Sequence, residues 1–313
     1  MIAPSRRAAY VALIATAALW GSNAVVARGL LESVPVIWLA TLRWVIVLAL
    51  LAPFVWRDRV AIAGALRNDW RALALFALLG FAPQNILIYV GLSGTTAINF
   101  GLLNSAIPVM IVFVAAVAHR RRPGSLETIG LALSLAGVGA IVARGDLRAI
   151  ADLAVNSSDL LVLVGMLVWA VYTVKLARRP SDLPFPSFVF AAGLIGMVIS
   201  LPAIGWQLAR HGLPAPTPGE WAGILYIGAL PSLVATLLFG YGLARVGAVQ
   251  AGVFTHLVPV FAAVFAVIWI GERLHAYHAV GFALVAGGAL LCCLRPEPML
   301  SSPPGRVREP RPS

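Results

Sequence analysis

Polar and aromatic side chains interrupt the long apolar stretches of this sequence, at positions where they could bind a small polar molecule. In a lipid bilayer such groups face the interior of a helix bundle or a cavity, because lipid offers no hydrogen-bond partners. We therefore predict that they line a cavity for a small-molecule substrate. The alternative is that they only bond neighbouring helices, where each contact contributes about 0.6 kcal/mol on average. The predicted cavity residues are Trp20, Asn23, Arg43, Gln84, Tyr89, Asn99, Asn104, Ser105, Trp169, Tyr172, Ser232, Thr236, Gln250, Thr255 and His256.

Arg43 is the only basic residue well inside an apolar stretch. One interpretation is that its guanidinium binds a substrate carboxylate; the other is that it bonds backbone carbonyls or extends to the membrane surface. Trp20 and Trp169 also lie well inside their stretches, away from the ends where interfacial tryptophans usually gather. Two indole rings facing a cavity would suit aromatic or cationic organic substrates, whereas packed or lipid-facing rings would have no such role.

Acidic residues are missing from the centres of the apolar stretches, since all 12 fall in predicted loops, tails or helix ends. Proton-coupled carriers often use a buried carboxylate that binds proton and substrate in turn. His256 is the titratable group nearest the centre of a stretch. Protons are therefore a candidate coupling ion, with a hydrogen-bonded structural histidine as the alternative. This pattern favours a facilitator or a weakly coupled exporter.

No cofactor or metal is predicted from the sequence. Cys292 and Cys293, the only cysteines, are adjacent and lack the spacing of metal ligands. The chain lacks a Gly-Lys-Ser/Thr phosphate-binding signature, so we expect no drive by ATP through this chain itself. His275 and His278 beside Glu272 are the only close grouping of histidines with an acid, which gives an integral-membrane transferase little support.

The composition indicates that lipid covers much of the molecule. Of the 313 residues, 60% are hydrophobic and only 11% are charged, whereas soluble domains carry about 25% charged residues. The net charge of +11 would suggest nucleic-acid binding in a soluble protein. Here the basic residues form short runs between apolar segments, so we predict a lipid bilayer as the partner and no nucleic acid. A monomer is the simplest expectation, and the sequence leaves the oligomeric state open.

Stretches of about 20 apolar residues are long enough to cross a bilayer as helices. Most of the 23 Lys and Arg residues then fall on the side of the N-terminus, which places both termini in the cytoplasm and requires an even number of crossings. Residues 295–313 are predicted to form a disordered cytoplasmic tail. The ten predicted spans lie near 9–29, 35–56, 71–91, 95–118, 125–143, 159–177, 186–208, 220–243, 247–270 and 276–294.

An internal repeat divides the chain into residues 1–150 and 151–294. Residues 91–137 align with 242–288 without a gap, and the identical pairs include Gly101 with Gly252 and Pro108 with Pro259. Five crossings in each half is an odd number, so the second half is predicted to be inverted relative to the first. Inverted repeats are typical of secondary transporters that work by alternating access. The prolines expected to act as hinges are Pro83, Pro108, Pro231 and Pro259.

The sequence resembles EamA-type members of the drug/metabolite transporter superfamily over nearly all of residues 9–294. The resemblance rests on the segments Leu19–Asn23, Leu42–Trp44, Ala248–Pro259 and Gly271–Arg273. It implies an all-α integral membrane protein of ten transmembrane helices, arranged as two inverted five-helix repeats around a central cavity. Among the branches of the superfamily, the sequence most resembles exporters of aromatic amino acids of the YddG kind. The Gly-Glu-Arg feature occurs only in the second repeat, where the first has His119-Arg120-Arg121-Arg122.

These patterns together predict a secondary transporter rather than an enzyme. The expected substrate is a small neutral or zwitterionic metabolite, above all an aromatic or large neutral amino acid, exported across the bacterial inner membrane. A carrier of cationic drugs or of another metabolite is the main alternative. A channel fits the paired prolines less well, and a nucleotide-sugar carrier would need several cations in its cavity where Arg43 stands alone.

Overall fold

The computed structural model describes residues 6–104, 106–118, 124–142, 156–177, 179, 183–255 and 257–293. Throughout these residues the regular secondary structure is helical, as predicted. The predicted tail at 295–313 lies outside the described residues. The helices are α1 Arg6–Leu30, α2 Val36–Val55, η1 Trp56–Asp58, α3 Arg59–Asn68, α4 Trp70–Gly80, α5 Ala82–Ser93, α6 Ala97–Asn104, α7 Ile107–Ala118, α8 Ser125–Val142, α10 Ser157–Leu176, α11 Phe185–His211, α12 Pro218–Ile227, η2 Gly228–Val234, α13 Ala235–Phe254, α14 Leu257–Ile270 and α15 Ala276–Cys293.

Within the described residues, seven helical segments are long and apolar enough to cross a membrane. They agree with seven of the predicted spans, and the protein is therefore a multi-pass membrane protein. Three further apolar helices are shorter and correspond to the remaining predicted spans: Thr128–Gly137, Leu257–Ile270 and Ala276–Gly288. The seven long segments are Arg6–Leu30, Val36–Asn68, Trp70–Ser93, Asn99–Ala118, Ser157–Leu176, Phe185–His211 and Pro218–Ala248.

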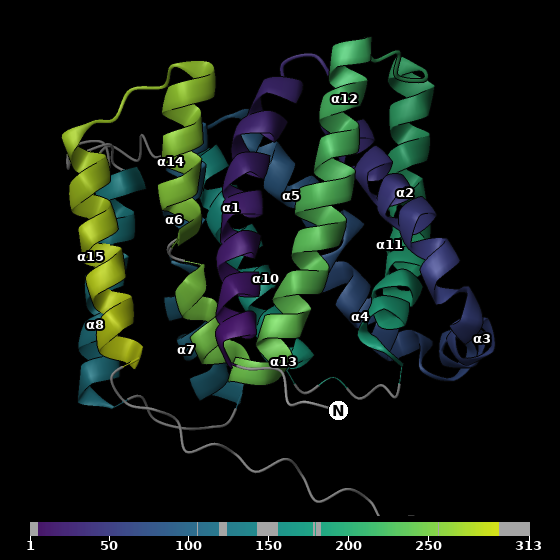
Figure 1. Ribbon diagram of the computed structural model, residues 1–313. Helices are drawn as coiled ribbons and strands as arrows, with labels where there is room; N and C mark the ends of the chain where they lie inside the picture. The colour runs from purple at the N-terminus through teal and green to yellow at the C-terminus, as the bar shows by residue number, and fades with distance from the viewer. Residues whose placement is uncertain are drawn as a thin grey trace, which may run out of the picture.

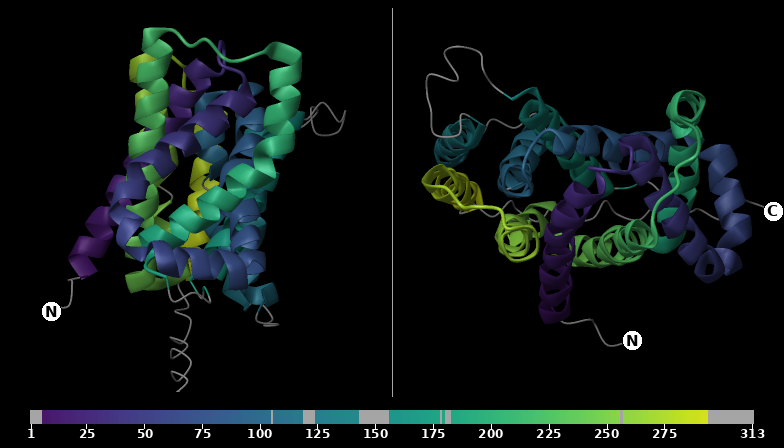
Figure 2. Two further views of the ribbon diagram at one scale, coloured as in Figure 1. Left: turned by 90° about the vertical axis from the view of Figure 1, so that its right-hand side faces the viewer. Right: turned by 90° about the horizontal axis from the view of Figure 1, so that it is seen from above.

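The helices stand side by side in one bundle, with α1 near its middle (Figures 1 and 2). α8 and α15 pair at one edge, and α2, α3 and α11 form the other. We call the end where α1 begins the near end; it also holds α3. The opposite end, where α1 meets α2 and α14 meets α15, is called the far end.

Large apolar side chains cover the outside of the bundle, where lipid can surround them. Phe54 is 80% exposed and Ile268 is 70% exposed. Inside, small residues allow the helices to approach closely, which is how membrane helices gain van der Waals contact without a hydrophobic driving force. Gly21 illustrates this, because a Cβ at this position would lie 2.6 Å from Cβ of Phe261.

Equivalent positions of the two halves contact each other reciprocally. A Cβ added to Gly101 would lie 3.4 Å from Cα of Pro259, and one added to Gly252 would lie 3.8 Å from Cα of Pro108. Gly101 aligns with Gly252, and Pro108 aligns with Pro259. Each half therefore places its glycine against the proline of the other.

A second pair of contacts between the two halves is reciprocal in the same way. A Cβ on Gly91 would lie 2.7 Å from Cγ2 of Val162, and one on Gly242 would lie 2.6 Å from Cδ2 of Leu13. Gly91 aligns with Gly242. Leu19-Trp20-Gly21 resembles Val168-Trp169-Ala170 at nearly the same offset, and this register pairs Leu13 with Val162. The first helix of each half thus packs at corresponding positions of the other half.

Several apolar helices are interrupted near the middle of the bundle. α4 and α5 are separated at Phe81, where φ is −122° and ψ is −148°. α6 ends at Asn104 and α7 begins at Ile107. Between α12 and α13 the chain forms the π-helix η2 instead of a regular α-helix. Residues beside all three interruptions, Gly80, Asn104 and Pro231 among them, line the same cavity.

The prolines predicted as hinges all lie at such interruptions. Pro83 lies in the first turn of α5, where its missing N–H costs no hydrogen bond. Pro108 and Pro259 lie in the first turns of α7 and α14, and Pro231 lies within η2. Whether the helices bend there during transport stays a prediction.

Candidate functional site

A cavity of about 100 Å³ lies at the level of the helix interruptions. One buried water needs roughly 10–15 Å³, so the cavity has room for several waters or a small organic molecule. Its wall combines predicted residues with others that the prediction did not include. The predicted cavity residues are Trp20, Asn23, Arg43, Gln84, Asn104, Trp169 and Thr236, joined by the predicted hinge Pro231 and by Asn85, a polar residue of the same apolar stretch as Gln84. The residues that were not predicted are Trp44, Gly80, Ile88, Phe100, Ile107 and Met166.

Arg43 extends from α2 into this cavity and is only 7% exposed. Its Nε donates to Oγ of Ser232 over 2.9 Å, and its Nη1 donates to the hydroxyl of Tyr89 over 2.5 Å. Among the described residues, Arg43 forms no salt bridge and Nη2 makes no hydrogen bond. The neutral partners fix the guanidinium plane without cancelling its charge, so the cavity contains a positioned cation that can bind an anionic group.

Ser232 and Tyr89 hold Arg43 from two different helices. The wider turn of η2 lets the hydroxyl of Ser232 donate to the carbonyl of Ile227 over 2.6 Å while it accepts from Arg43. π-Helical turns of this kind are often found at functional sites. The Tyr89 hydroxyl donates to Oδ1 of Asn23 over 3.4 Å. One network therefore joins α1, α2, α5 and η2 around the guanidinium.

Aromatic rings cluster around Trp20 and Trp169 in the wall of the cavity. The rings of Trp20 and Trp169 meet edge to face, with centroids 5.4 Å apart and planes at 89°. Phe239 lies 5.1 Å from Trp20, and Tyr172 stacks on Trp169 at 4.9 Å. Tyr172 lies about one turn before α10 ends at Leu176, so the cluster extends from the cavity towards the near end.

The remaining predicted residues lie around the cavity or outside the described part. Tyr89 and Ser232 support Arg43, and Tyr172 belongs to the aromatic cluster. Thr255 is buried, and its hydroxyl donates to the carbonyl of Gly252 over 2.6 Å. Asn99 lies in the first turn of α6, at the far end of the bundle, and does not line the cavity. Ser105, His256 and the side chain of Gln250 lie outside the described residues.

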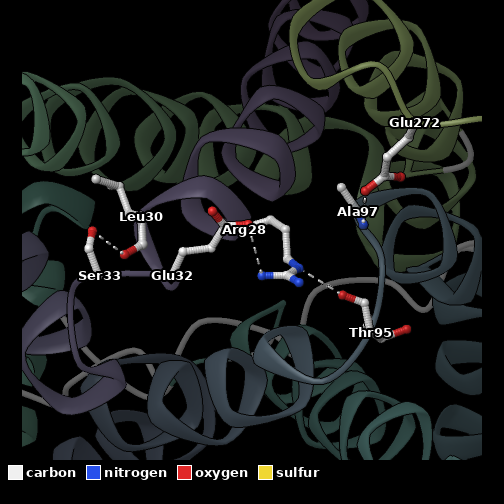
Figure 3. Close-up of polar contacts among 7 residues, drawn as sticks. All are labelled: Arg28, Leu30, Glu32, Ser33, Thr95, Ala97 and Glu272. Carbon is white, nitrogen blue, oxygen red and sulfur yellow. Dashed lines mark hydrogen bonds and ion pairs between the residues drawn. The ribbon is translucent and has the colours of Figure 1, made fainter.

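A second polar cluster, the far-end junction, connects the segment at the start of α6 to Arg28 of α1 and to Glu272 in the loop between α14 and α15 (Figure 3), and also to Asp159 of α10. Nε of Arg28 donates to the carbonyl of Thr95 over 3.0 Å, and the hydroxyl of Thr95 donates to Oδ1 of Asp159 over 2.5 Å. Oε1 of Glu272 accepts a hydrogen bond from the backbone N–H of Ala97 over 2.9 Å. Since Ala97 is the first residue of α6, this carboxylate satisfies an N–H that the helix itself leaves unbonded.

His278 completes the far-end junction from α15. Its Nδ1 accepts a hydrogen bond from the backbone N–H of His275 over 3.1 Å, so the neutral ring carries its proton on Nε2. That Nε2 lies 3.1 Å from Oδ1 of Asn99 and donates to it. The sequence analysis noted Glu272 and His278 as a close grouping but did not connect them with α6.

Comparison with known proteins identifies the family. The sequence model of the EamA-like transporter family matches residues 7–143 and again residues 156–294. The chain belongs to the EamA-like transporter family. The resemblance noted in the sequence is thereby confirmed at the level of the family, while the nearer likeness to YddG-type exporters stays a prediction.

Curated relatives of this transporter carry similar names. An uncharacterized transporter, YetK of Bacillus subtilis, is 25% identical over 92% of this chain and 87% of its own length. An uncharacterized transporter of Archaeoglobus fulgidus is 27% identical over 90% of this chain and 96% of its own. A probable terminal-alkyne amino-acid exporter of Streptantibioticus cattleyicolor is 29% identical over 72% of this chain and 73% of its own.

A solved crystal structure has the same fold as the transporter. It superposes with a TM-score of 0.64 and covers 93% of this chain and 98% of its own, at 21% sequence identity. Family and relatives thus indicate a transporter rather than an enzyme. In the described part of the chain, no group of three or more His, Cys, Asp or Glu side chains could hold a metal ion.

Proposed function

We propose that this transporter exports amino acids, aromatic or large neutral ones, across the bacterial inner membrane. The observation that carries the proposal is Arg43, a buried cation that faces the cavity and is held by neutral partners only, among the described residues. A substrate carboxylate would satisfy this charge with the strong, directional hydrogen bonds that guanidinium groups form. Trp20 and Trp169 beside it offer ring surfaces to an apolar or aromatic side chain.

We further propose ten spans in two inverted repeats, residues 1–150 and 151–294, with both termini in the cytoplasm. The family model matches the two halves separately. The reciprocal contacts of Gly101 with Pro259 and of Gly252 with Pro108 support the exchange of equivalent positions that such a repeat requires. The shorter helices α8, α14 and α15 would then cross the membrane as well.

Alternating access is the mechanism that suits this architecture. In inverted-repeat transporters the substrate site lies near the membrane centre, where interrupted helices end. The interruptions at Phe81 and after Asn104 border the proposed site. Rocking of one half against the other would expose it to each side in turn, with Pro83, Pro108, Pro231 and Pro259 as hinges. Transport would be facilitated or weakly coupled, with protons as the candidate ion and His256 as its carrier.

One relative favours an amino-acid substrate. The Streptantibioticus cattleyicolor protein is named a probable exporter of a terminal-alkyne amino acid. The alternative of a carrier for cationic drugs fits the cavity less well, because like charges repel strongly at low dielectric and Arg43 is the only charged residue in the described wall. An amino acid brings both a carboxylate for Arg43 and a side chain for the aromatic rings.

The proposal is tested by flux of labelled phenylalanine through proteoliposomes that contain the purified protein, with and without an imposed pH gradient. We expect saturable flux that competing large neutral amino acids inhibit. Flux that is the same with and without the gradient indicates a facilitator, and accumulation driven by the gradient indicates proton coupling. Flux no greater than in empty liposomes, for phenylalanine and for a panel of other amino acids, would reject the amino-acid substrate.

A further inference from the structure

We propose that the side-chain amides of Gln84, Asn85 and Asn104 form a binding subsite for the ammonium group of the substrate. This inference rests on the proposed transport of amino acids and assigns the part of the cavity that Arg43 does not explain. All three residues line the cavity, and all three are buried. Gln84 and Asn85 lie in the first turn of α5, and Asn104 is the last residue of α6.

The orientation of the three amides follows from what their nitrogens bond. Nδ2 of Asn85 donates to the carbonyl of Phe81 over 2.8 Å. Nδ2 of Asn104 donates to the carbonyl of Phe100 over 3.3 Å, and Nε2 of Gln84 to that of Gly165 over 3.4 Å. A backbone carbonyl can only accept, so the amide atom beside it must be the nitrogen. The amide oxygens are therefore directed away from those carbonyls.

The oxygens of these amides have hydrogen-bonding capacity left. Among the described residues, no donor bonds Oε1 of Gln84 or Oδ1 of Asn85 or Asn104. Each of the three oxygens borders accessible space. The indole nitrogens of Trp38 and Trp44, in contrast, are enclosed by protein and have no hydrogen-bond partner. Since the residues line the cavity, this accessible space is the cavity itself.

The chemistry of these groups matches a primary ammonium. An ammonium group has three N–H donors and no acceptor, while an amide oxygen accepts two hydrogen bonds and donates none. Arg43 supplies the opposite function, because a guanidinium only donates. The cavity thus has a donor at Arg43 and a set of acceptors on α5 and α6, and the molecule that satisfies both is a zwitterion.

Neutral acceptors in the wall also leave Arg43 available to bind a substrate carboxylate. A carboxylate in the wall would bind an ammonium more strongly, but in the empty cavity it would pair with the guanidinium and block both subsites. Amide oxygens accept from the ammonium without competing for Arg43 to the same degree. The described wall of the cavity contains no acidic residue, as expected if neutral amides bind the ammonium and Arg43 binds the carboxylate.

The proposal predicts which analogues the transporter rejects. 3-Phenylpropionate has the carboxylate and ring of phenylalanine but no ammonium, and phenethylamine has the ring and ammonium but no carboxylate. Hydrogen bonds to a charged group are strong enough that their loss weakens binding about tenfold or more. We expect phenylalanine to compete for the site at least about tenfold better than either analogue.

The test compares these ligands as competitors of phenylalanine flux in wild type and variants. Asn85→Leu and Asn104→Leu remove the acceptor while they keep the branched heavy-atom skeleton, and they should abolish the preference for phenylalanine over 3-phenylpropionate. They should leave the affinity for 3-phenylpropionate itself unchanged, which a merely unfolded site would not do. Gln207→Met is the matched control, because Gln207 is a buried amide on α11 that does not line the cavity.

The outcomes separate this inference from the proposed function. Equal competition by phenylalanine and 3-phenylpropionate in the wild type would overturn the ammonium subsite and leave carboxylate transport standing. Retention of the full preference by both asparagine variants would overturn the assignment to these residues. If no amino acid is transported, the proposed function fails, and the ammonium subsite fails with it.

Discussion

The central cavity and the far-end junction are both rich in polar residues, yet they use them in opposite ways. In the junction the polar groups bond one another: Arg28 bonds Thr95, Glu272 bonds the N-terminus of α6, and His278 bonds Asn99. In the cavity, Nη2 of Arg43 and the oxygens of three amides have no partner among the described residues. Polar groups that bond one another join helices, and groups with hydrogen-bonding capacity left towards a cavity can bind a ligand.

The comparison also separates two asparagines that the sequence analysis predicted at the same cavity. Asn99 and Asn104 lie on the same short helix, α6, and both are buried. Asn99 is bonded to His278 at the far end, whereas Asn104 borders the cavity. A polar residue in an apolar helix therefore indicates an interior position, and only its partners distinguish a helix-to-helix contact from a binding group.

The largest effect is expected for Arg43→Gln. Transport should fall about a hundredfold or more, because a charge-assisted pair with the substrate carboxylate is lost. Thermal stability in detergent should hold or rise, since an unpaired buried charge is removed together with its desolvation cost. Flux and melting temperature measured on the same preparation check both parts; near-normal flux would remove Arg43 from the substrate site.

Substitution of the indole pair should have the next largest effect. Trp20→Leu or Trp169→Leu is expected to reduce flux of phenylalanine about tenfold but flux of a small amino acid such as alanine much less, because ring stacking is lost. Trp206→Leu is the control, since Trp206 is exposed on the outside of α11. An equal loss for both substrates would show that the rings support the fold and not the ligand.

A smaller effect is expected for Ser232→Ala. The variant removes one hydrogen bond to Arg43, and the KM for phenylalanine should rise about threefold to tenfold. Ser232→Thr keeps the hydroxyl and should restore most of the affinity. If the alanine variant lowers the maximal rate at unchanged KM instead, Ser232 acts in the conformational step rather than in positioning Arg43.

The smallest effect on transport is expected at the far-end junction. Glu272→Gln weakens the cap of α6 and should lower the free energy of unfolding by about 1 kcal/mol, with KM unchanged. Glu32→Gln is the control, because Glu32 is 73% exposed and its ion pair with Arg28 contributes little. A large change of KM in the Glu272 variant would contradict the division between the two regions.

Apolar length and the distribution of polar residues allowed much of this protein to be predicted. The helical class follows from apolar stretches whose backbone groups must bond within the segment. Trp20, Asn23, Arg43, Gln84, Asn104, Trp169 and Thr236 were expected at a cavity because lipid cannot satisfy polar groups, and the structure places them there. The apolar residues of the wall, such as Ile88 and Phe100, could not be predicted from the sequence. Apolar residues occur equally in a protein core, in a cavity wall and in contact with lipid.

The sequence by itself thus determined that the chain is helical, that lipid surrounds it, and which residue types must lie inside. Only the tertiary structure decided which interior polar groups bond one another and which face the cavity with capacity left. Arg43 received Ser232 and Tyr89 as partners from η2 and α5, positions far apart in the sequence. A hydrogen bond forms only when the donor–acceptor distance is right to a few tenths of an ångström and the donor points at the acceptor. Such geometry arises only when the helices have packed.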